Sequence, residues 1–419
     1  MMRIGFAKTN ITPPPGTELG GYAGHRPCRG VHDPLYCKAI VLDQDSARYA
    51  LLVLDLLCVD EALYLRIADA VTELGISRER LIISAIHSHA APRGVVPGEG
   101  PLAPVNRSSD PKAPVFSAYV QLVTESARTA CESALKKMES FLIRAAQGPL
   151  PAVGSERHTG AAPKGCLTVI ECRTESGKKL ILYNFPCHPT VMNAANLEVS
   201  ADFAAGIETL LAADMAVFAN GAAGDVSTRF TRLEASFEEC ARMGSIAAEQ
   251  IKTVISDVPF MQPEPLHGIH TRITLRARRV ESPEEAQKRL EEMTTRWQRA
   301  EAEGVDAATV RTLKSYAEGA GLNLQFSRSL GDIRQLQLPV TVFRFAGLAF
   351  ATVPGELFSA LQPEGIAIIG YANGYYRYIG GEDAYEKGYY EALAAIIDRG
   401  EGETLVNQIL KLLDQLDKM

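Results

Sequence analysis

Strand-like and helix-like segments alternate over the first 260 residues of this chain, and that alternation limits the folds it can adopt. Apolar segments at 38–43, 48–59 and 81–86 are typical of buried strands, whereas residues 61–74 and 115–138 have helical spacing. The same alternation continues through an expected strand at 179–185, a helix at 201–213, a strand at 215–219 and a helix at 233–255. This order predicts an α/β fold in which helices cover a mixed sheet.

The middle of the chain has a different pattern. Residues 266–279 alternate apolar and polar side chains, as a half-buried strand does. Residues 281–320 are charged and rich in helix-forming residues, and they begin with Ser-Pro-Glu-Glu, which is a helix start with a serine cap. We therefore expect a helical hairpin inserted over residues 281–322, followed by a return to strand at 340–353.

Composition excludes several classes of function. The 419-residue chain has a net charge of −7 and no long basic run, which argues against a nucleic-acid partner. Its most apolar run, YALLVLDLLCV, is too short to span a bilayer and contains Asp55, so we expect no transmembrane segment. The N-terminus lacks a signal peptide's apolar region, and the eight scattered cysteines form no CxxC. We expect free thiols and a cytoplasmic location.

Polar residues with metal-binding and catalytic chemistry follow four of the expected strands. Ligands of α/β sheets bind beyond the carboxyl ends of the strands. The four segments are SAIHSHAAP with His87 and His89, NFPCHPTVMN with His188, FANGAAGDVST with Asp225 and Ser227, and ATVPGELFSA with Glu356.

Two histidines and a carboxylate form the ligand set of a catalytic zinc ion. On an extended segment His87 and His89, two residues apart, point to the same side and can reach one pocket. The chain has no HExxH helix, which excludes that metalloprotease arrangement. Each residue also has a structural interpretation. A histidine at a strand end often makes only a structural hydrogen bond, Asp225 and Ser227 could cap the helix that follows, and Glu356 could lie in a surface turn. Both interpretations stay open on this evidence.

The complete set of motifs, in this order, resembles the N-terminal catalytic domain of the neutral/alkaline ceramidase family. IHSHAAP is similar to the family's HTHSGP motif, and NFPCHPTVMN is similar to its YACHPTSMN segment. The opening GFAKTNITPPPGTELGGYAG, GDVS, VPGE and the tyrosine-rich GYANGYYRYIGGEDAYEKGYYEALA also resemble family segments. The resemblance implies an α/β catalytic domain that holds one zinc ion and hydrolyses the amide bond of N-acylsphingosine.

The resemblance also implies the metal ligands. His87, His188, Glu356 and Tyr378 would bind the zinc ion. His89 would lie beside the metal without binding it, and would take the proton of the attacking water and deliver it to the leaving amine. Each ligating histidine should donate its other ring N–H to an acceptor, for which the candidates are Asp55, Asp202 and Asp225.

Three further residues have roles implied by the resemblance. Tyr390 would point its hydroxyl at the substrate carbonyl, and Ser227 would line the same pocket. Arg157, in GSERHTG, corresponds to an active-site arginine of the family.

We accordingly expect a single ceramidase-like catalytic domain over residues 1–419, with no signal peptide and no additional C-terminal β-domain. Ala90-Ala91 stand where the family has Ser-Gly, at the substrate entrance, so the substrate stays open between a lipid and a small N-acyl compound. The alternatives are an esterase or amidase for small non-lipid substrates and a metal-binding protein without catalysis. A long apolar groove near residues 90–104 would favour a lipid, and a closed polar pocket would favour a small substrate.

Two of the four other histidines stay open between a structural and a functional role. His25 and His32 lie in YAGHRPCRGVHDPLY, where a turn cap is the favoured interpretation of His32 over a residue that lines the pocket. His267 and His270, in the expected strand at 266–279, are interpreted as structural.

Overall fold

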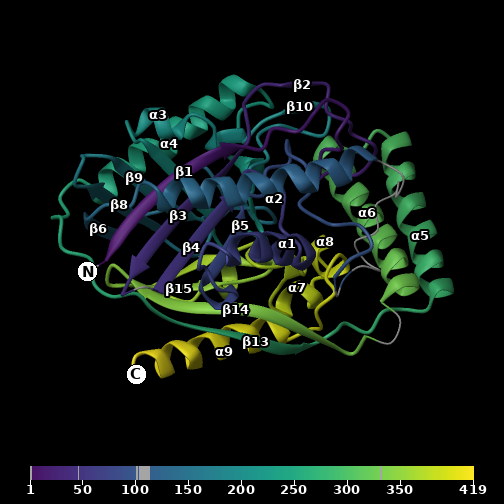
Figure 1. The fold of residues 1–419 in the computed structure, drawn as a ribbon. Helices are drawn as coiled ribbons and strands as arrows, with labels where there is room; N and C mark the ends of the chain where they lie inside the picture. Colours follow the sequence, from purple (N-terminus) through teal and green to yellow (C-terminus); the bar gives the residue numbers. More distant parts are fainter. Residues whose placement is uncertain (1, 46, 101, 103–113, 331–332) are drawn as a thin grey trace.

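The computed structural model describes residues 2–45, 47–100, 102, 114–330 and 333–419, and it confirms a mixed α/β fold. Figure 1 shows sheets packed together in the centre of the molecule with helices on the outside. Three of the sheets have four strands each, and all three have the same pattern of pairing. Two antiparallel pairs are followed by a fourth strand that runs parallel to the third.

The three sheets follow one another along the chain. The first contains β1 (Arg3–Asn10), β3 (Tyr36–Gln44), β4 (Ala47–Leu54) and β5 (Leu81–Ala85). The second contains β6 (Phe141–Gly148), β8 (Leu167–Thr174), β9 (Lys179–Phe185) and β11 (Met215–Asn220). The third contains β13 (His267–Arg276), β14 (Gln335–Phe345), β15 (Leu348–Thr352) and β17 (Ile366–Ile369). Three pairs of two-residue strands complete the arrangement: β2 (Gly30–Val31) with β10 (Glu198–Val199), β7 (Ser155–Glu156) with β12 (Val226–Ser227), and β16 (Glu356–Leu357) with β18 (Tyr378–Ile379).

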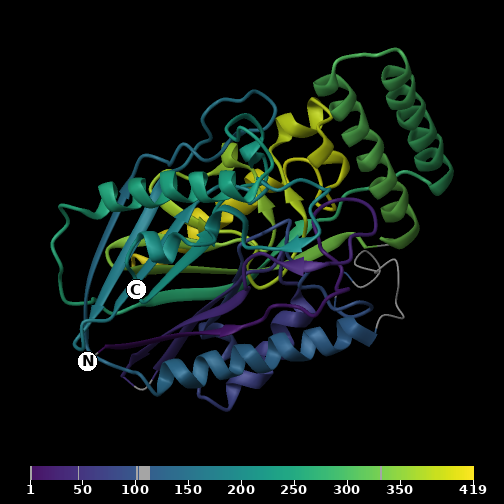
Figure 2. The ribbon, with the colours of Figure 1, turned by 90° about the horizontal axis from the view of Figure 1, so that it is seen from above.

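Amphipathic helices cover the sheets. The covering helices are α1 (Glu61–Thr72), α2 (Pro114–Leu135), α4 (Phe237–Ile255) and α9 (Glu401–Leu416). Helix α2 lies along the first sheet and α4 along the second, and α9 packs beneath β13 and β14 (Figures 1 and 2). The helix expected at 201–213 is instead a 3-10 turn (Asp202–Ala204) and the short α3 (Ile207–Leu210). Gly206, with φ of +76°, separates them because a left-handed residue cannot continue a helix.

The expected helical hairpin is present as α5 (Pro283–Ala302) and α6 (Ala307–Ser329). Ser282 and Glu285 form a reciprocal capping box at the start of α5, as the Ser-Pro-Glu-Glu sequence predicts. Helix α6 continues past the expected end at residue 322. The hairpin projects from one end of the molecule, away from both termini (Figure 2). No helix among the described segments is long and apolar enough to cross a membrane.

The three sheets are joined where their parallel strand pairs meet. Asn184 donates its side-chain amide to carbonyls in two sheets, at Ala219 and Ile368, both at 2.7 Å. Ser84 Oγ donates to the Gly370 carbonyl at 2.8 Å, which links the first sheet to the third. These polar side chains are 0–4% exposed, so their hydrogen bonds satisfy groups that water cannot reach. The carboxyl ends of strands from all three sheets therefore open into one central region.

Candidate metal centre

Each four-stranded sheet contributes a side chain to this central region. His87 follows β5, His188 follows β9, and Glu356 begins the short β16 after β15. Glu356 and Tyr378 are direct partners in the parallel pair of β16 and β18. The fold thus gathers His87, His188 and Glu356, and the backbone pairing of β16 with β18 sets Tyr378, the fourth ligand implied by the family resemblance, beside Glu356.

The two inner histidines have ring orientations set by the backbone. His87 Nδ1 lies 2.7 Å from the Leu57 carbonyl, and His188 Nδ1 lies 2.9 Å from the Val226 carbonyl. A carbonyl only accepts, so each Nδ1 carries a proton, and Nε2 is the atom that a neutral ring offers to a metal. Burial and the charge of Arg157 lower the pKa of His188 to about 4, which keeps this imidazole neutral at pH 7. Both rings therefore have the orientation that directs Nε2 into the site.

The carboxylate of Glu356 lies between these two lone pairs. Its Oε2 is 3.0 Å from His188 Nε2 and 3.4 Å from His87 Nε2. Neither approach is a hydrogen bond for Oε2 of Glu356 or Nε2 of His188, which have no hydrogen-bond partner among the described residues. All three side chains are at most 2% exposed. Buried polar atoms that converge without partners point to a ligand that this set of donors would bind.

His89 lies further out, on the half-buried rim of the site. Its Nε2 is 3.3 Å from His87 Nε2, while its Nδ1 is buried without a partner in the described chain. The ligand atoms of His87, His89 and His188 all lie within 4.8 Å of one another, so a three-histidine site is also geometrically allowed. The ring of Tyr22 meets His89 edge-on at 4.8 Å. Within the described part of the chain, His89 differs from His87 and His188 in having no backbone carbonyl that fixes the tautomer of its ring.

The prediction that His87 and His89 lie on an extended strand is wrong. The strand ends at Ala85, and His87 has a left-handed backbone with φ of +69°, so an extended i, i+2 segment does not explain their proximity. A left-handed conformation is uncommon and costly for a residue with a side chain, and such conformations concentrate at functional sites.

Aromatic and charged residues form the next layer. Tyr378 and Tyr390 meet edge-on with ring centroids 5.9 Å apart. Arg157, with a side chain only 10% exposed, donates to Glu391 at 3.0 Å, and His158 contacts the other oxygen of Glu391 at 3.1 Å. The Nε–H of Arg157 has no hydrogen-bond partner in the described structure. Arg157 is therefore bound to Glu391, the residue that follows Tyr390 in the chain.

The backbone of Ser227 is bridged to His188, and its side chain caps the 3-10 turn Thr228–Phe230 by accepting from the Arg229 N–H. None of the three aspartates proposed as acceptors of the imidazole N–H groups has that role. The backbone carbonyls of Leu57 and Val226 accept these N–H groups instead. The aspartates bind elsewhere: Asp55 accepts from the Tyr36 N–H, Asp202 from the N–H groups of Val191, Met192 and Phe203, and Asp225 from Ser359. The prediction of an aspartate acceptor was wrong because peptide groups after the neighbouring strands already face the imidazoles.

Two tyrosines at the site were missed by the sequence analysis. Tyr375 donates its hydroxyl to Glu356 Oε1, which leaves Oε2 facing the histidines. Tyr371 stacks on the His87 ring with centroids 4.1 Å apart, and its buried hydroxyl has no partner among the described residues. The available signal was their place in the tyrosine-rich segment, where Tyr375 is three residues before Tyr378.

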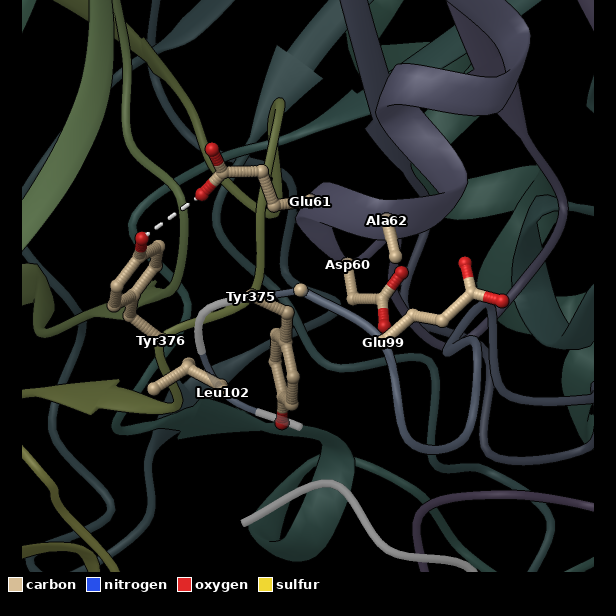
Figure 3. Close-up of a pocket in the computed structure, with 8 residues that line it drawn as sticks. Asp60, Glu61, Ala62, Glu99, Leu102, Tyr375 and Tyr376 are labelled. Atoms are coloured by element: carbon tan, nitrogen blue, oxygen red, sulfur yellow. Dashed lines mark hydrogen bonds between the residues drawn. The ribbon is translucent and has the colours of Figure 1, made fainter. Parts of the chain in front are cut away.

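Tyr375 also lines a small pocket (Figure 3). Acidic and aromatic side chains dominate its lining, which consists of Asp60, Glu61, Ala62, Glu99, Gly100, Leu102, Tyr375 and Tyr376. Burial raises the pKa of Asp60 to about 7. The segment at 90–104, where an apolar groove would favour a lipid, contributes Glu99, Gly100 and Leu102 to this polar pocket, while residues 101, 103 and 104 lie outside the described residues.

The remaining histidines have contacts of their own. His25 Nδ1 is 2.9 Å from Glu18, and His32 Nδ1 is 3.0 Å from Asp33. His270 Nδ1 is 2.9 Å from Thr341 Oγ1, on the neighbouring strand β14, and His267 begins β13. None of these contacts involves the candidate ligands.

Comparisons with known proteins agree with the fold. The sequence matches no protein-family profile and no curated protein. A solved structure described as a ceramidase complexed with C2 matches with a TM-score of 0.70 and 15% identity, over 97% of this chain and 74% of that one. Neutral ceramidase from Pseudomonas aeruginosa matches with a TM-score of 0.72 and 15% identity, over 97% of this chain and 73% of that one. The chain therefore has the fold of neutral ceramidase, and the resemblance noted in the sequence is confirmed at the level of the fold.

Proposed function

We propose that this protein is a zinc-dependent hydrolase that cleaves the amide bond of an N-acyl substrate. The observation that carries the proposal is the convergence of His87, His188 and Glu356 at the centre of a neutral ceramidase fold, with unpartnered buried atoms facing one another. Imidazole nitrogens, a carboxylate oxygen and a phenol oxygen suit a zinc ion. The proposed ligands are His87, His188, Glu356 and Tyr378.

A zinc ion in such a site supplies Lewis acidity, which makes water a competent nucleophile at neutral pH. The protein supplies the remaining functions. The carbonyls of Leu57 and Val226 hold the two imidazoles in the neutral, metal-binding tautomer. Tyr375 binds one oxygen of Glu356 and thereby orients the other. These contacts prepare the donor set before a metal arrives, which reduces the cost of ordering it.

His89 is proposed as the group that moves the proton. It lies on the rim, 3.3 Å from a proposed ligand, and its Nδ1 is not used by the described protein. Burial, together with His87 and His188, lowers its pKa well below the usual range, so the ring is neutral at pH 7 and can accept a proton from water. The same proton is then delivered to the leaving amine, which must be protonated to depart.

Tyr390 and Arg157 are proposed to stabilise charge on the acyl oxygen. A neutral phenol donates a hydrogen bond, and burial raises the pKa of Tyr390 to about 12, which keeps its proton in place. Arg157 adds a fixed positive charge from the same layer, and Ser227 lines the pocket beside His188.

A second candidate is an amidase or esterase for small, non-lipid N-acyl compounds. Among the described residues, the pocket beside Tyr375 is acidic and aromatic and forms no long apolar groove for an acyl chain (Figure 3). The two candidates share one catalytic centre and differ in the chain length of the preferred acyl group.

The test combines metal analysis with an assay of N-acyl substrates of increasing chain length. We expect one zinc ion per chain, with loss of both zinc and activity in His87→Ala and Glu356→Ala. His89→Ala should retain zinc and lose about 10²- to 10⁴-fold in turnover, the usual contribution of general acid–base catalysis. Zinc lost from His89→Ala but kept by Glu356→Ala would establish a three-histidine site instead. Full zinc occupancy without hydrolysis of any substrate would favour a metal-binding protein without catalysis.

A further inference from the structure

The short helix α8 (Tyr390–Leu393) begins with Tyr390, and four residues are too few to be a stable helix alone. Its conformation therefore depends on the elements packed against it. Helix α6 of the helical hairpin is one of these elements. At Gly319 the two helices lie close together, because an added Cβ would lie 3.1 Å from Leu393 Cβ and 3.2 Å from Tyr390 Cδ2.

Glycine is costly in the interior of a helix, by about 1 kcal/mol relative to alanine. Helix α6 contains two such positions, Gly319 and Gly321, with different surroundings. An added Cβ at Gly321 would meet only Leu290 Cδ1, at an ordinary 3.9 Å. Close approach of the backbone to Tyr390 thus explains glycine at 319, whereas packing does not require it at 321.

The same face of α6 is also connected to the other end of α8. Arg278 donates to the carbonyls of Ala392 at 2.8 Å and Leu393 at 2.9 Å. Its second Nη donates to Asn323 Oδ1 at 3.1 Å, and Asn323 lies one helical turn after Gly319. The terminal carbonyls of α8, which no helical N–H can reach, are thereby satisfied by an arginine fixed to the hairpin.

We propose that the helical hairpin is a positioning element of the active site, and that Gly319 is the residue of the hairpin that sets the place of the Tyr390 ring. The proposal rests on the function proposed above, in which the Tyr390 hydroxyl contacts the substrate. Gly319 acts only through Tyr390 and is a positioning residue. The hairpin would then control how well the acyl oxygen is held, although it projects from one end of the molecule (Figure 2).

The experiment compares Gly319→Ala with Gly321→Ala, because both variants gain the same helix propensity. An alanine at 319 forces Tyr390 or Leu393 to move by a few tenths of an ångström, and a misplacement of about 1 Å can cost about 10²-fold in rate. We expect kcat to fall about 3- to 10-fold in Gly319→Ala and to change less than about twofold in Gly321→Ala. Zinc content should be unchanged in both. Hydrogen exchange of residues 389–394 should be faster in Gly319→Ala alone.

The Tyr390→Phe background distinguishes an effect on the hydroxyl from a general structural effect. Adding Gly319→Ala to Tyr390→Phe should cause no further loss of turnover, because no hydroxyl remains to be misplaced. Equal turnover and equal exchange in the two glycine variants would overturn the proposal. Wild-type turnover in Tyr390→Phe would overturn the catalytic role of Tyr390 in the proposed function. The exchange measurement separates that failure from a failure of the packing argument, since it does not depend on activity.

Discussion

The hydrogen bond from Tyr375 to Glu356 offers a quantitative test of the proposed metal centre. Glu356 is 2% exposed, and Tyr375 donates to its Oε1 while Oε2 faces the two histidines. Burial raises the pKa of Tyr375 well above its usual range, so the hydroxyl stays protonated and donates at neutral pH. Tyr375→Phe removes this donor and leaves the aromatic ring in place.

The expected size of the effect follows from the charge on the acceptor. A hydrogen bond to a charged group contributes about 1.5–3 kcal/mol, which corresponds to about 10- to 150-fold in a binding constant. Loss of a partner that orients a metal ligand typically costs about 10- to 100-fold in metal affinity. We therefore expect the zinc dissociation constant of Tyr375→Phe to rise about 10- to 100-fold, measured by competition with a chromophoric chelator at constant pH.

Tyr376→Phe is the matched control. Tyr376 is the next residue and lines the same pocket (Figure 3), but its buried hydroxyl lies 3.1 Å from Glu61 and 3.0 Å from the Gln337 carbonyl. Its loss should lower the free energy of unfolding without changing zinc affinity. Wild-type zinc affinity in Tyr375→Phe, or an equal loss in both variants, would refute the idea that Tyr375 orients a metal ligand.

Two further predictions concern stability. Burial raises the pKa of Asp60 in the folded protein to about 7, above its unfolded value, so its linked stabilisation is complete below about pH 4 and is lost progressively as pH rises from about 4 through 7. Thermal unfolding should show a steeper decrease in Tm between about pH 4 and 7 for the wild type than for Asp60→Asn, and parallel pH profiles would contradict this. Asn373→Ala should reduce the free energy of unfolding, measured by urea titration, by about 2–3 kcal/mol. The reason is that Asn373 accepts a hydrogen bond from the buried Ile83 N–H at 2.7 Å and donates one to the Leu81 carbonyl at 3.2 Å. A loss below about 0.5 kcal/mol would show that other groups replace these bonds.

Local patterns in the sequence predicted the elements better than their ends. The capping box at Ser282 and Glu285 forms as the Ser-Pro-Glu-Glu sequence indicates, because its hydrogen bonds join residues three apart. The expected helix at 201–213 is interrupted at Gly206, whose left-handed backbone is compatible with the sequence but not required by it. Turn geometry and tertiary contacts thus decided where the expected helix is broken.

The candidate site shows the same division. The residue types of the site, and their place after apolar strands, were visible in the chain because strand ends are where α/β folds bind ligands. The acceptors of the imidazole N–H groups could not be predicted from the sequence, because they are the backbone carbonyls of Leu57 and Val226, residues with no polar side chain. Every residue has a carbonyl, so a sequence contains no signal of which one faces a histidine.

The sequence by itself determined the mixed α/β class, the inserted hairpin and the residue types of a metal centre, since these depend on periodicity and on side-chain chemistry. Only the tertiary structure decided that three sheets with the same strand pattern meet at their parallel pairs, which brings the Glu356 carboxylate within 3.4 Å of the Nε2 atoms of His87 and His188. It also decided that the Tyr375 hydroxyl donates to Glu356 and that the backbone at Gly319 lies close to the Tyr390 ring. Such contacts join residues 19 to more than 250 positions apart, and their distances depend on how whole sheets and helices pack.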